Sequence, residues 1–463
     1  LIEQENFHAG IEMMRRSLDK WRDAGDQRGE ALAFNGLGLA HLLTNEKQKA
    51  LDFYRRAEQI FPPDVDFFER AVLSNGIGSI YEDYGEWNIS LDYRRRALEL
   101  YELAGNIYGQ LATLPSLAVL SNLTGDATAA LAYLNQAREL AAKLDAPYYQ
   151  AIIAKELGNF YFERGEPEKA SDNYRKALAH FEKDPFMREI ALIRNKLGEL
   201  HLLASDPEAA RAEFEAALEI HRRVENRFGE AQTLFNLARL ERAENNLEKA
   251  LAYSRSSLEL TESLSTDVLN SNLKRTYLSN VFERYDLHIN TLMTLERAAP
   301  GNNYAAQALE TAEKSRARSL LENLALTEAD FIKDADPEML RREKEIRARL
   351  TLKSDRLTDL LSGKAEQAEV ENLSAEIRRL ENELETIKAG LKRSSPVYSA
   401  VKDPPPFDLR EFQTRALDEN SLLLEFSLGA SESYLWLVGK NDFEYFILPP
   451  RREIEQKVES LRA

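Results

Sequence analysis

The sequence contains no cysteine, which excludes disulfide bonds, zinc-thiolate sites and a thiol nucleophile from this chain. It also lacks any apolar run of the roughly 18 residues that a membrane-spanning helix needs. Positive charge is in deficit, with 61 lysines and arginines against 78 aspartates and glutamates. An acidic surface repels nucleic-acid backbones and anionic membranes, so neither is predicted as a partner. A basic peptide or a polar protein surface fits the composition better.

The six histidines do not suggest a metal site. His41 and His201 take the place of a packing tyrosine in the repeat described below. His180 and His221 have no cysteine or carboxylate partner at a metal-ligand spacing. The sequence therefore predicts no metal and no cofactor.

A helix-turn-helix unit recurs through residues 1–265 at intervals of 40 residues. In one copy, small residues at Gly158 and Ala170 would let two helices approach closely, while Tyr161 and Tyr174 fill the space beside them. The corresponding first-helix pairs are Leu37-Gly38, Ile77-Gly78, Leu117-Ala118, Leu157-Gly158, Leu197-Gly198 and Leu237-Ala238. The second helices keep the same interval at Ala50, Ser90, Ala130, Ala170, Ala210 and Ala250.

These units resemble tetratricopeptide repeats. The first full unit has the signature residues Phe34, Leu37, Gly38, His41, Ala50, Tyr54, Ala57 and Pro62 at the matching places. The usual period is about 34 residues, so a period of 40 implies a longer second helix or a longer turn between repeats, as in peptide receptors of the kinesin-light-chain type. The resemblance implies a mainly α fold, a right-handed superhelix whose first helices line a concave channel.

Asparagines recur on the first helices and suggest what the channel binds. Asn35, Asn75 and Asn195 occupy the same place in their units, and Asn236 lies one place later. A side-chain amide can donate to and accept from a peptide backbone at once, which favours a peptide or protein ligand. Two alternatives stay open: these asparagines lie on a solvated helix face, or they bond neighbouring repeats to each other.

Two further residues resemble part of a carboxylate clamp. Lys155 and Asn159 lie one helical turn apart, as in chaperone-binding repeats. The basic partners expected in the next two units are not evident, and Lys196 is the only candidate. We place Lys155 and Asn159 among the predicted peptide-binding positions.

Residues 266–330 are predicted to contain two long helices, 268–297 and 304–326, that cap the repeats. Within the second, residues 312–324 resemble the junction between repeats and protease in the CHAT family, the caspase-like cysteine peptidases related to separases. The resemblance implies interdomain ion-pair donors at Lys314, Arg316 and Arg318. The alternative is a basic patch on an ordinary amphipathic helix.

Residues 331–396 are predicted to form an antiparallel hairpin of two coiled-coil-like helices. The second helix places apolar residues in alternating steps of three and four, at Val370, Leu373, Ile377, Leu380, Leu384, Ile387 and Leu391. Each arm would be roughly 35 to 40 Å long. The hairpin could be a lever, a lid or an oligomer contact, and the sequence does not choose among them.

Residues 397–463 change from helical to strand periodicity. A linker with three consecutive prolines precedes a short helix, and the strands predicted after it are 421–428, 433–439 and 443–448, followed by a helix over 452–462. This order resembles the opening of a CHAT domain. Catalysis in that family uses a histidine and a cysteine, but no histidine follows His288, so no catalytic residue is carried over. The small α/β segment looks incomplete, and the catalytic remainder is expected to be absent from the chain as given.

The main interpretation is therefore the regulatory and substrate-recruiting part of a CHAT-family cysteine protease, with the missing protease half as a possible partner. The alternatives are a stand-alone repeat adaptor and a sensor that signals through the repeats and the hairpin. This chain is not predicted to be an enzyme in any of them. It opens in mid-repeat, so an upstream segment could have been lost, and a cytoplasmic location is expected.

Overall fold

The structure is a computed structural model that describes residues 2–43, 47–62, 66–183, 186–265, 271–326, 335–362, 367–395, 398 and 407–462. Its fold is mainly α, with one small sheet near the C-terminal end. The chain divides into two compact units. Unit 1 comprises Leu1–Leu200, Leu269–Arg275 and Thr351–Val370, and unit 2 comprises His201–Val268, Thr276–Leu350 and Glu371–Ala463. Among the described residues, no helix combines the length and apolarity needed to cross a membrane.

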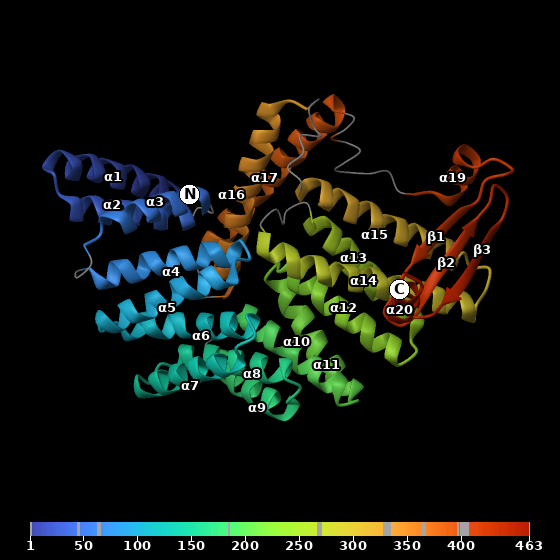
Figure 1. Cartoon of the computed structure of the whole chain (residues 1–463), viewed down its shortest axis with the longest axis horizontal. Helices are drawn as coiled ribbons and strands as arrows, with labels where there is room; N and C mark the ends of the chain where they lie inside the picture. Colours follow the sequence, from blue (N-terminus) through green and yellow to red (C-terminus); the bar gives the residue numbers. More distant parts are fainter. Residues whose placement is uncertain are drawn as a thin grey trace. The chain divides into compact units, whose positions relative to one another are not determined.

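Unit 1 contains helices that pack as successive antiparallel pairs. The pairs are α2 with α3, α4 with α5, α6 with α7, and α8 with α9, and each pair contacts the next (Figure 1). The helix bounds are α1 Ile2–Ala24, α2 Gln27–Leu43, α3 Lys47–Ile60, α4 Phe67–Asp83, α5 Trp87–Leu103, α6 Ile107–Leu123, α7 Ala127–Lys143, α8 Pro147–Glu163, α9 Pro167–Phe181 and α10 Met187–Leu203.

The period of 40 residues arises from equal helices rather than from long turns. Each helix from α4 to α8 has 17 residues. Three-residue turns join them, so one helix and one turn fill half a period. Gly105, with φ 62°, ends α5, and Asn106 begins α6 by accepting a hydrogen bond from the Gly109 N–H at 2.7 Å. The longer second helix, one of the two options that the sequence left open, therefore explains the period.

Inside each pair, a small residue on the first helix faces a larger one on the second. Tyr174 is fully buried, and a Cβ added to Gly158 would lie 2.5 Å from its Cδ1 atom. Gly38 meets Tyr54 in the same way, also at 2.5 Å. Tyr161 is half-buried and has the Lys169 ammonium 5.1 Å from its ring centroid. The close helix approach predicted from the small residues is confirmed.

Unit 2 contains further helices and the sheet. The bounds are α11 Pro207–Arg223, α12 Arg227–Ala243, α13 Leu247–Ser265, α14 Ser271–Ala298, α15 Tyr304–Leu326, α16 Pro337–Ser362, α17 Gln367–Ser394, α19 Leu409–Ala416 and α20 Arg451–Arg462. Residues 271–275 of α14, 351–362 of α16 and 367–370 of α17 belong to unit 1. The helix predicted over 304–326 is α15, with the same bounds. The predicted hairpin corresponds to α16 and α17, where Leu380, Leu384 and Ile387 share a buried cluster with Ile346. The side chain of Val370 lies outside the described residues.

The sheet is a three-stranded antiparallel meander with β2 in the centre. Its strands are β1 Leu423–Ser427, β2 Ser433–Val438 and β3 Phe443–Leu448. Trp436 pairs in register with Glu425 and Tyr445, and it packs into a core with residues of α14 and α15. The Tyr434 hydroxyl donates to Asn290 Oδ1 on α14 at 2.7 Å. These contacts fix the sheet to the two helices by one of its faces.

Candidate functional site

The asparagine position on the first helices bonds neighbouring repeats. The Asn35 amide, on α2, donates from Nδ2 to the Glu69 carbonyl on α4 at 3.0 Å. Three periods further on, Lys155 on α8 reaches the Glu189 carboxylate on α10 at 2.9 Å. Positions 35 and 69 become 155 and 189 after the same shift of 120 residues, so equivalent positions join both pairs of repeats, through a backbone carbonyl in one and a carboxylate in the other. Burial alone would lower the pKa of Lys155, but Glu156 and Glu189 outweigh it, and the pKa is raised.

Asn75 and Asn159 bond within their own helix pairs. Asn75 Oδ1 accepts from Arg94 Nη1 on α5 at 2.9 Å. Asn159 donates to Glu156 at 2.9 Å, and its Oδ1 accepts from the Tyr174 hydroxyl at 2.7 Å. Burial raises the pKa of Tyr174, so that hydroxyl keeps its proton. Both amides therefore already form hydrogen bonds within the scaffold.

The remaining predicted positions are buried. Asn195 on α10 is 5% exposed, and Asn236 on α12 is 1% exposed. Neither amide atom of Asn236 has a hydrogen-bond partner in the described part of the chain. Lys196 lies 3.3 Å from Glu199 and 4.6 Å from the Phe162 ring centroid. The peptide-binding role of these positions stays a prediction, and the structure assigns several of them to contacts within the scaffold.

The first helices also expose aliphatic side chains that the sequence analysis did not single out. Leu39 on α2, Val119 on α6 and Leu192 on α10 are 40%, 39% and 41% exposed. Leu39, Val119 and Asn159 share one register position, because they are separated by multiples of 40 residues. The other units have Ser79, Glu199 and Arg239 at this position, so the repeat pattern gave no clear signal for it. We call Leu39, Val119, Asn159 and Leu192 the first-helix surface.

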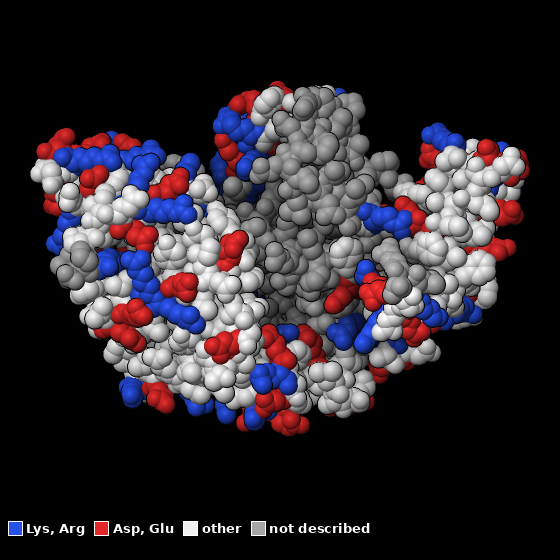
Figure 2. Space-filling model, in the orientation of Figure 1, with Lys and Arg blue, Asp and Glu red and all other residues white. Residues whose placement is uncertain are grey.

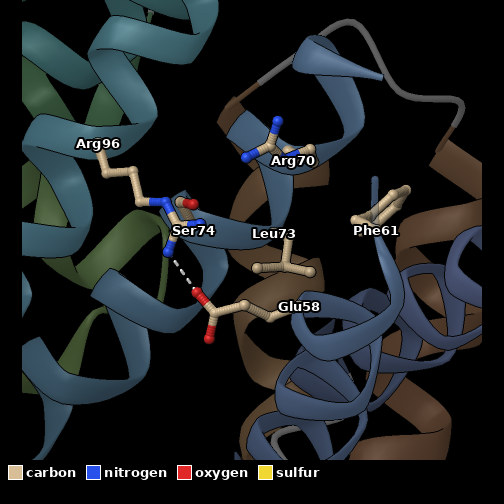
Figure 3. A pocket seen from close by; sticks show the side chains of 6 residues that line it. All are labelled: Glu58, Phe61, Arg70, Leu73, Ser74 and Arg96. Carbon is tan, nitrogen blue, oxygen red and sulfur yellow. Dashed lines mark hydrogen bonds and ion pairs between the residues drawn. The ribbon is translucent and has the colours of Figure 1, made fainter. Parts of the chain in front are cut away.

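Charge does not mark a binding site on the face of unit 1 drawn in Figure 2. Positive and negative side chains are interspersed there rather than gathered by sign (Figure 2). Between α3, α4 and α5, Glu58 accepts from Arg96 Nη1 at 2.5 Å beside a gap of about 10 Å³ (Figure 3). That volume holds about one water molecule, so the gap is a packing feature and not a ligand site.

The basic residues of α15 contact two different elements of unit 2. Arg316 forms an ion pair with Glu425 on β1 and donates to the Phe426 carbonyl at 2.8 Å. Lys314 forms an ion pair with Glu262 on α13. The side chain of Arg318 lies outside the described residues. Arg316 thus joins the capping helix to the sheet.

Family comparison agrees with the repeat geometry. The model of the tetratricopeptide repeat matches residues 1–62, 109–183 and 189–263. These segments are tetratricopeptide repeats. All matched residues lie before 264, so the resemblance of the terminal segment to a CHAT domain stays a prediction.

Similar proteins include a regulatory protein and two proteins named as a sensor or as having one. The regulatory protein RapG of Bacillus subtilis is 24% identical over 151 residues, which cover 31% of this chain and 40% of RapG. Among solved structures, the quorum sensor NprR from B. thuringiensis is 14% identical, with a TM-score of 0.49, over 66% of this chain and 84% of NprR. A signal transduction ATPase with a tetratricopeptide-repeat sensor, from Pyrococcus horikoshii, is 14% identical with a TM-score of 0.48, over 84% of this chain and 55% of that one. At these values, the structural likenesses say nothing about what this chain binds.

Proposed function

We propose that this chain is a non-catalytic repeat scaffold that binds a peptide or protein segment along the first-helix surface. The observation that carries the proposal is the exposure of Leu39, Val119 and Leu192 away from the ends of their first helices. The other exposed large apolar residues of these helices lie in the first or last two positions, at Ile107, Tyr108, Leu43, Leu123 and Leu203. About 40% of each side chain is exposed, so covering one under a ligand would contribute about 0.6–1.2 kcal/mol. The similarity to RapG, which is named a regulatory protein, supports a regulatory role for the binding.

The hydrogen-bonding pattern indicates which ligand groups this surface would recognise. Asn159 lies at the same register position as Val119, and its amide has one N–H donated to Glu156 and its oxygen bonded to Tyr174. A ligand on the first-helix surface would therefore contact mainly aliphatic side chains and few amide groups that are free to form hydrogen bonds. Recognition would rest on apolar side chains of the ligand, in contrast to a ladder of amide bonds to its backbone.

The double substitution Val119→Glu and Leu192→Glu is expected to abolish this binding. A displayed library of random dodecapeptides would be selected on the whole chain, and the affinities of the enriched peptides would be measured by fluorescence anisotropy. We expect a loss of about tenfold or more on the double variant, because two charges replace the buried aliphatic groups. Both positions are exposed, so stability should change by about 0.5 kcal/mol or less.

Leu103→Glu is the matched control for this experiment. Leu103 is 66% exposed and lies at the end of the second helix α5, outside the first-helix surface. Peptides enriched on the native chain should bind this variant unchanged. The proposal would be contradicted if every class of enriched peptide bound the native chain and the Val119/Leu192 variant with equal affinity.

A second candidate is that the scaffold regulates a CHAT-family cysteine protease. The observation that favours it is the sheet face opposite α14 and α15, where Leu424, Phe426 and Phe446 are 53%, 48% and 44% exposed. A sheet in an α/β domain carries helices on both faces, so an apolar face of this kind suits a further layer. The Arg316 contact with Glu425 agrees with an interdomain junction at α15.

The intact mass of the native gene product tests this second candidate. We expect a product tens of kilodaltons heavier than 52.8 kDa that is alkylated by iodoacetamide. This chain contains no cysteine, so any alkylated thiol must belong to additional sequence. A product of 52.8 kDa without label would overturn the protease association and leave the scaffold proposal untouched.

A further inference from the structure

An aromatic hollow lies where the start of α8 meets the end of α9 and the start of α10. It has a volume of about 410 Å³ and is lined by Pro147, Tyr148, Ala151, His180, Phe181, Lys183 and Phe186. This volume falls within the range of roughly 300–1,000 Å³ in which small-ligand pockets are found. The hollow lies within unit 1 and shares no residue with the first-helix surface.

The walls of the hollow are aromatic rings that pack on each other. The Tyr148 and Phe186 ring centroids are 5.1 Å apart, and those of Phe181 and Phe186 are 5.7 Å apart. Phe181 is buried and forms the base, whereas Tyr148 and Phe186 are 47% and 36% exposed. Tyr148 and Phe186 therefore pack on a buried ring, while part of each of their own rings stays exposed to solvent.

This aromatic surface extends beyond the hollow into the preceding repeat. Tyr148 contacts Tyr149 at 5.5 Å, and Tyr149 contacts Tyr108 at 6.3 Å between ring centroids. Tyr108 is 60% exposed and lies one period of 40 residues before Tyr148. An occupant of the hollow can thus continue along a row of rings, which suits an extended segment better than a compact molecule.

The charged residues around the hollow indicate which charge a ligand bound there would carry. His180 and Lys183 line it, and neither has an ion-pair partner among the described residues, whereas the described lining contains no carboxylate. Two neighbouring carboxylates of the described residues are paired, because Glu182 lies 2.8 Å from Arg194 and Glu189 lies 2.9 Å from Lys155. Lys183 therefore places one cation beside the rings in a chain with a net charge of −17.

We propose that this hollow docks an acidic segment of a partner protein, which inserts one large apolar side chain between Tyr148 and Phe186 and places a carboxylate beside Lys183. Tyrosine and other aromatic residues dominate the energetics of protein interfaces, and complementary charge gives specificity. The Lys183 ammonium disfavours a cationic ligand, although aromatic rings by themselves attract cations. The proposal does not rest on the first-helix surface, and the two surfaces could engage one partner or two.

The dodecapeptide library selected on the whole chain also tests this proposal, with different variants. We expect an enriched class with one Trp, Phe or Leu flanked by Asp or Glu. Tyr148→Ser and Lys183→Glu should each weaken that class by about tenfold. Reselection on the Lys183→Glu variant should replace the flanking acids with Lys or Arg, which a structural role of Lys183 would not produce.

The Val119/Leu192 variant is the matched control, and it should bind the acidic class unchanged. Loss of the acidic class on that variant but not on Tyr148→Ser would overturn docking at the hollow and assign these peptides to the first-helix surface. The absence of any enriched acidic class that Tyr148→Ser weakens would overturn it as well. Lys183 is exposed, so its variant is expected to fold even where Tyr148→Ser lowers helicity in circular dichroism.

Discussion

Replacing Gly158 with valine is expected to lower the free energy of unfolding of the α8–α9 pair by about 3 kcal/mol, near the upper end for overpacked cores. A Cβ at this position would lie 2.5 Å from the Tyr174 Cδ1 atom and 2.6 Å from its Cε1 atom. Tyr174 is fully buried and its hydroxyl is bonded to Asn159, so the ring cannot swing aside cheaply. Hydrogen exchange of the α8 and α9 amides would measure the loss locally, as suits a repeat protein whose units are stabilised by neighbours.

The chain itself supplies a control for this substitution. Two helices earlier, the positions equivalent to Gly158 and Tyr174 are Ala118 and Leu134, and both are buried. We expect Gly158→Ala to destabilise and the double change Gly158→Ala with Tyr174→Leu to recover part of that loss, because the pair then matches the earlier repeat. Additive losses in the double variant would contradict the steric account.

Trp436→Ala is expected to destabilise the sheet and its supporting helices by about 3–5 kcal/mol, the usual loss for removing a large buried aromatic side chain. Trp436 is fully buried on the central strand and shares its core with Leu292 of α14 and Leu309 of α15. Losing it leaves a cavity that backbone pairing on both sides of β2 prevents from closing. Faster hydrogen exchange in β2, α14 and α15, with unchanged exchange in α4 to α8, would measure the effect.

The Trp436→Phe variant distinguishes the effect of side-chain volume on stability from the effect of the indole N–H group. The Trp436 Nε1 atom is buried without a hydrogen-bond partner among the described residues. Phenylalanine removes that unpaired donor and most ring volume is kept, so we expect a loss of about 1 kcal/mol or less. A loss as large as that of alanine would mean that the indole N–H has a partner that the core packing does not explain.

The helices and strands could be predicted because their signals are local. The recurring Leu-Gly and Ala positions predicted the helix pairs, and alternation predicted a strand over 443–448, which is β3 with the same bounds. The period of 40 residues left two options, and helix length decided between them. The turn between α5 and α6 is local in the same sense, because Gly105 ends one helix and Asn106 caps the next.

The candidate site could be predicted only in part, because its chemistry depends on contacts between distant residues. Asn35 could equally face a ligand or a neighbouring repeat, and its bond to Glu69, 34 residues away, exists only once the repeats stack. The aliphatic surface at Leu39 and Val119 was also missed, because periodicity cannot tell which apolar positions the core leaves exposed.

The sequence by itself determined the repeat, its period, the helix pairs and the three strands, because small residues, caps and apolar periodicity act over a few residues at a time. Only the tertiary structure decided which polar side chains the scaffold uses and which apolar ones it exposes. It also brought Arg316 to Glu425 and joined Tyr148 to Phe186. The physical reason is that burial and pairing are properties of packed surfaces, and residues that lie far apart in the chain contribute to those surfaces.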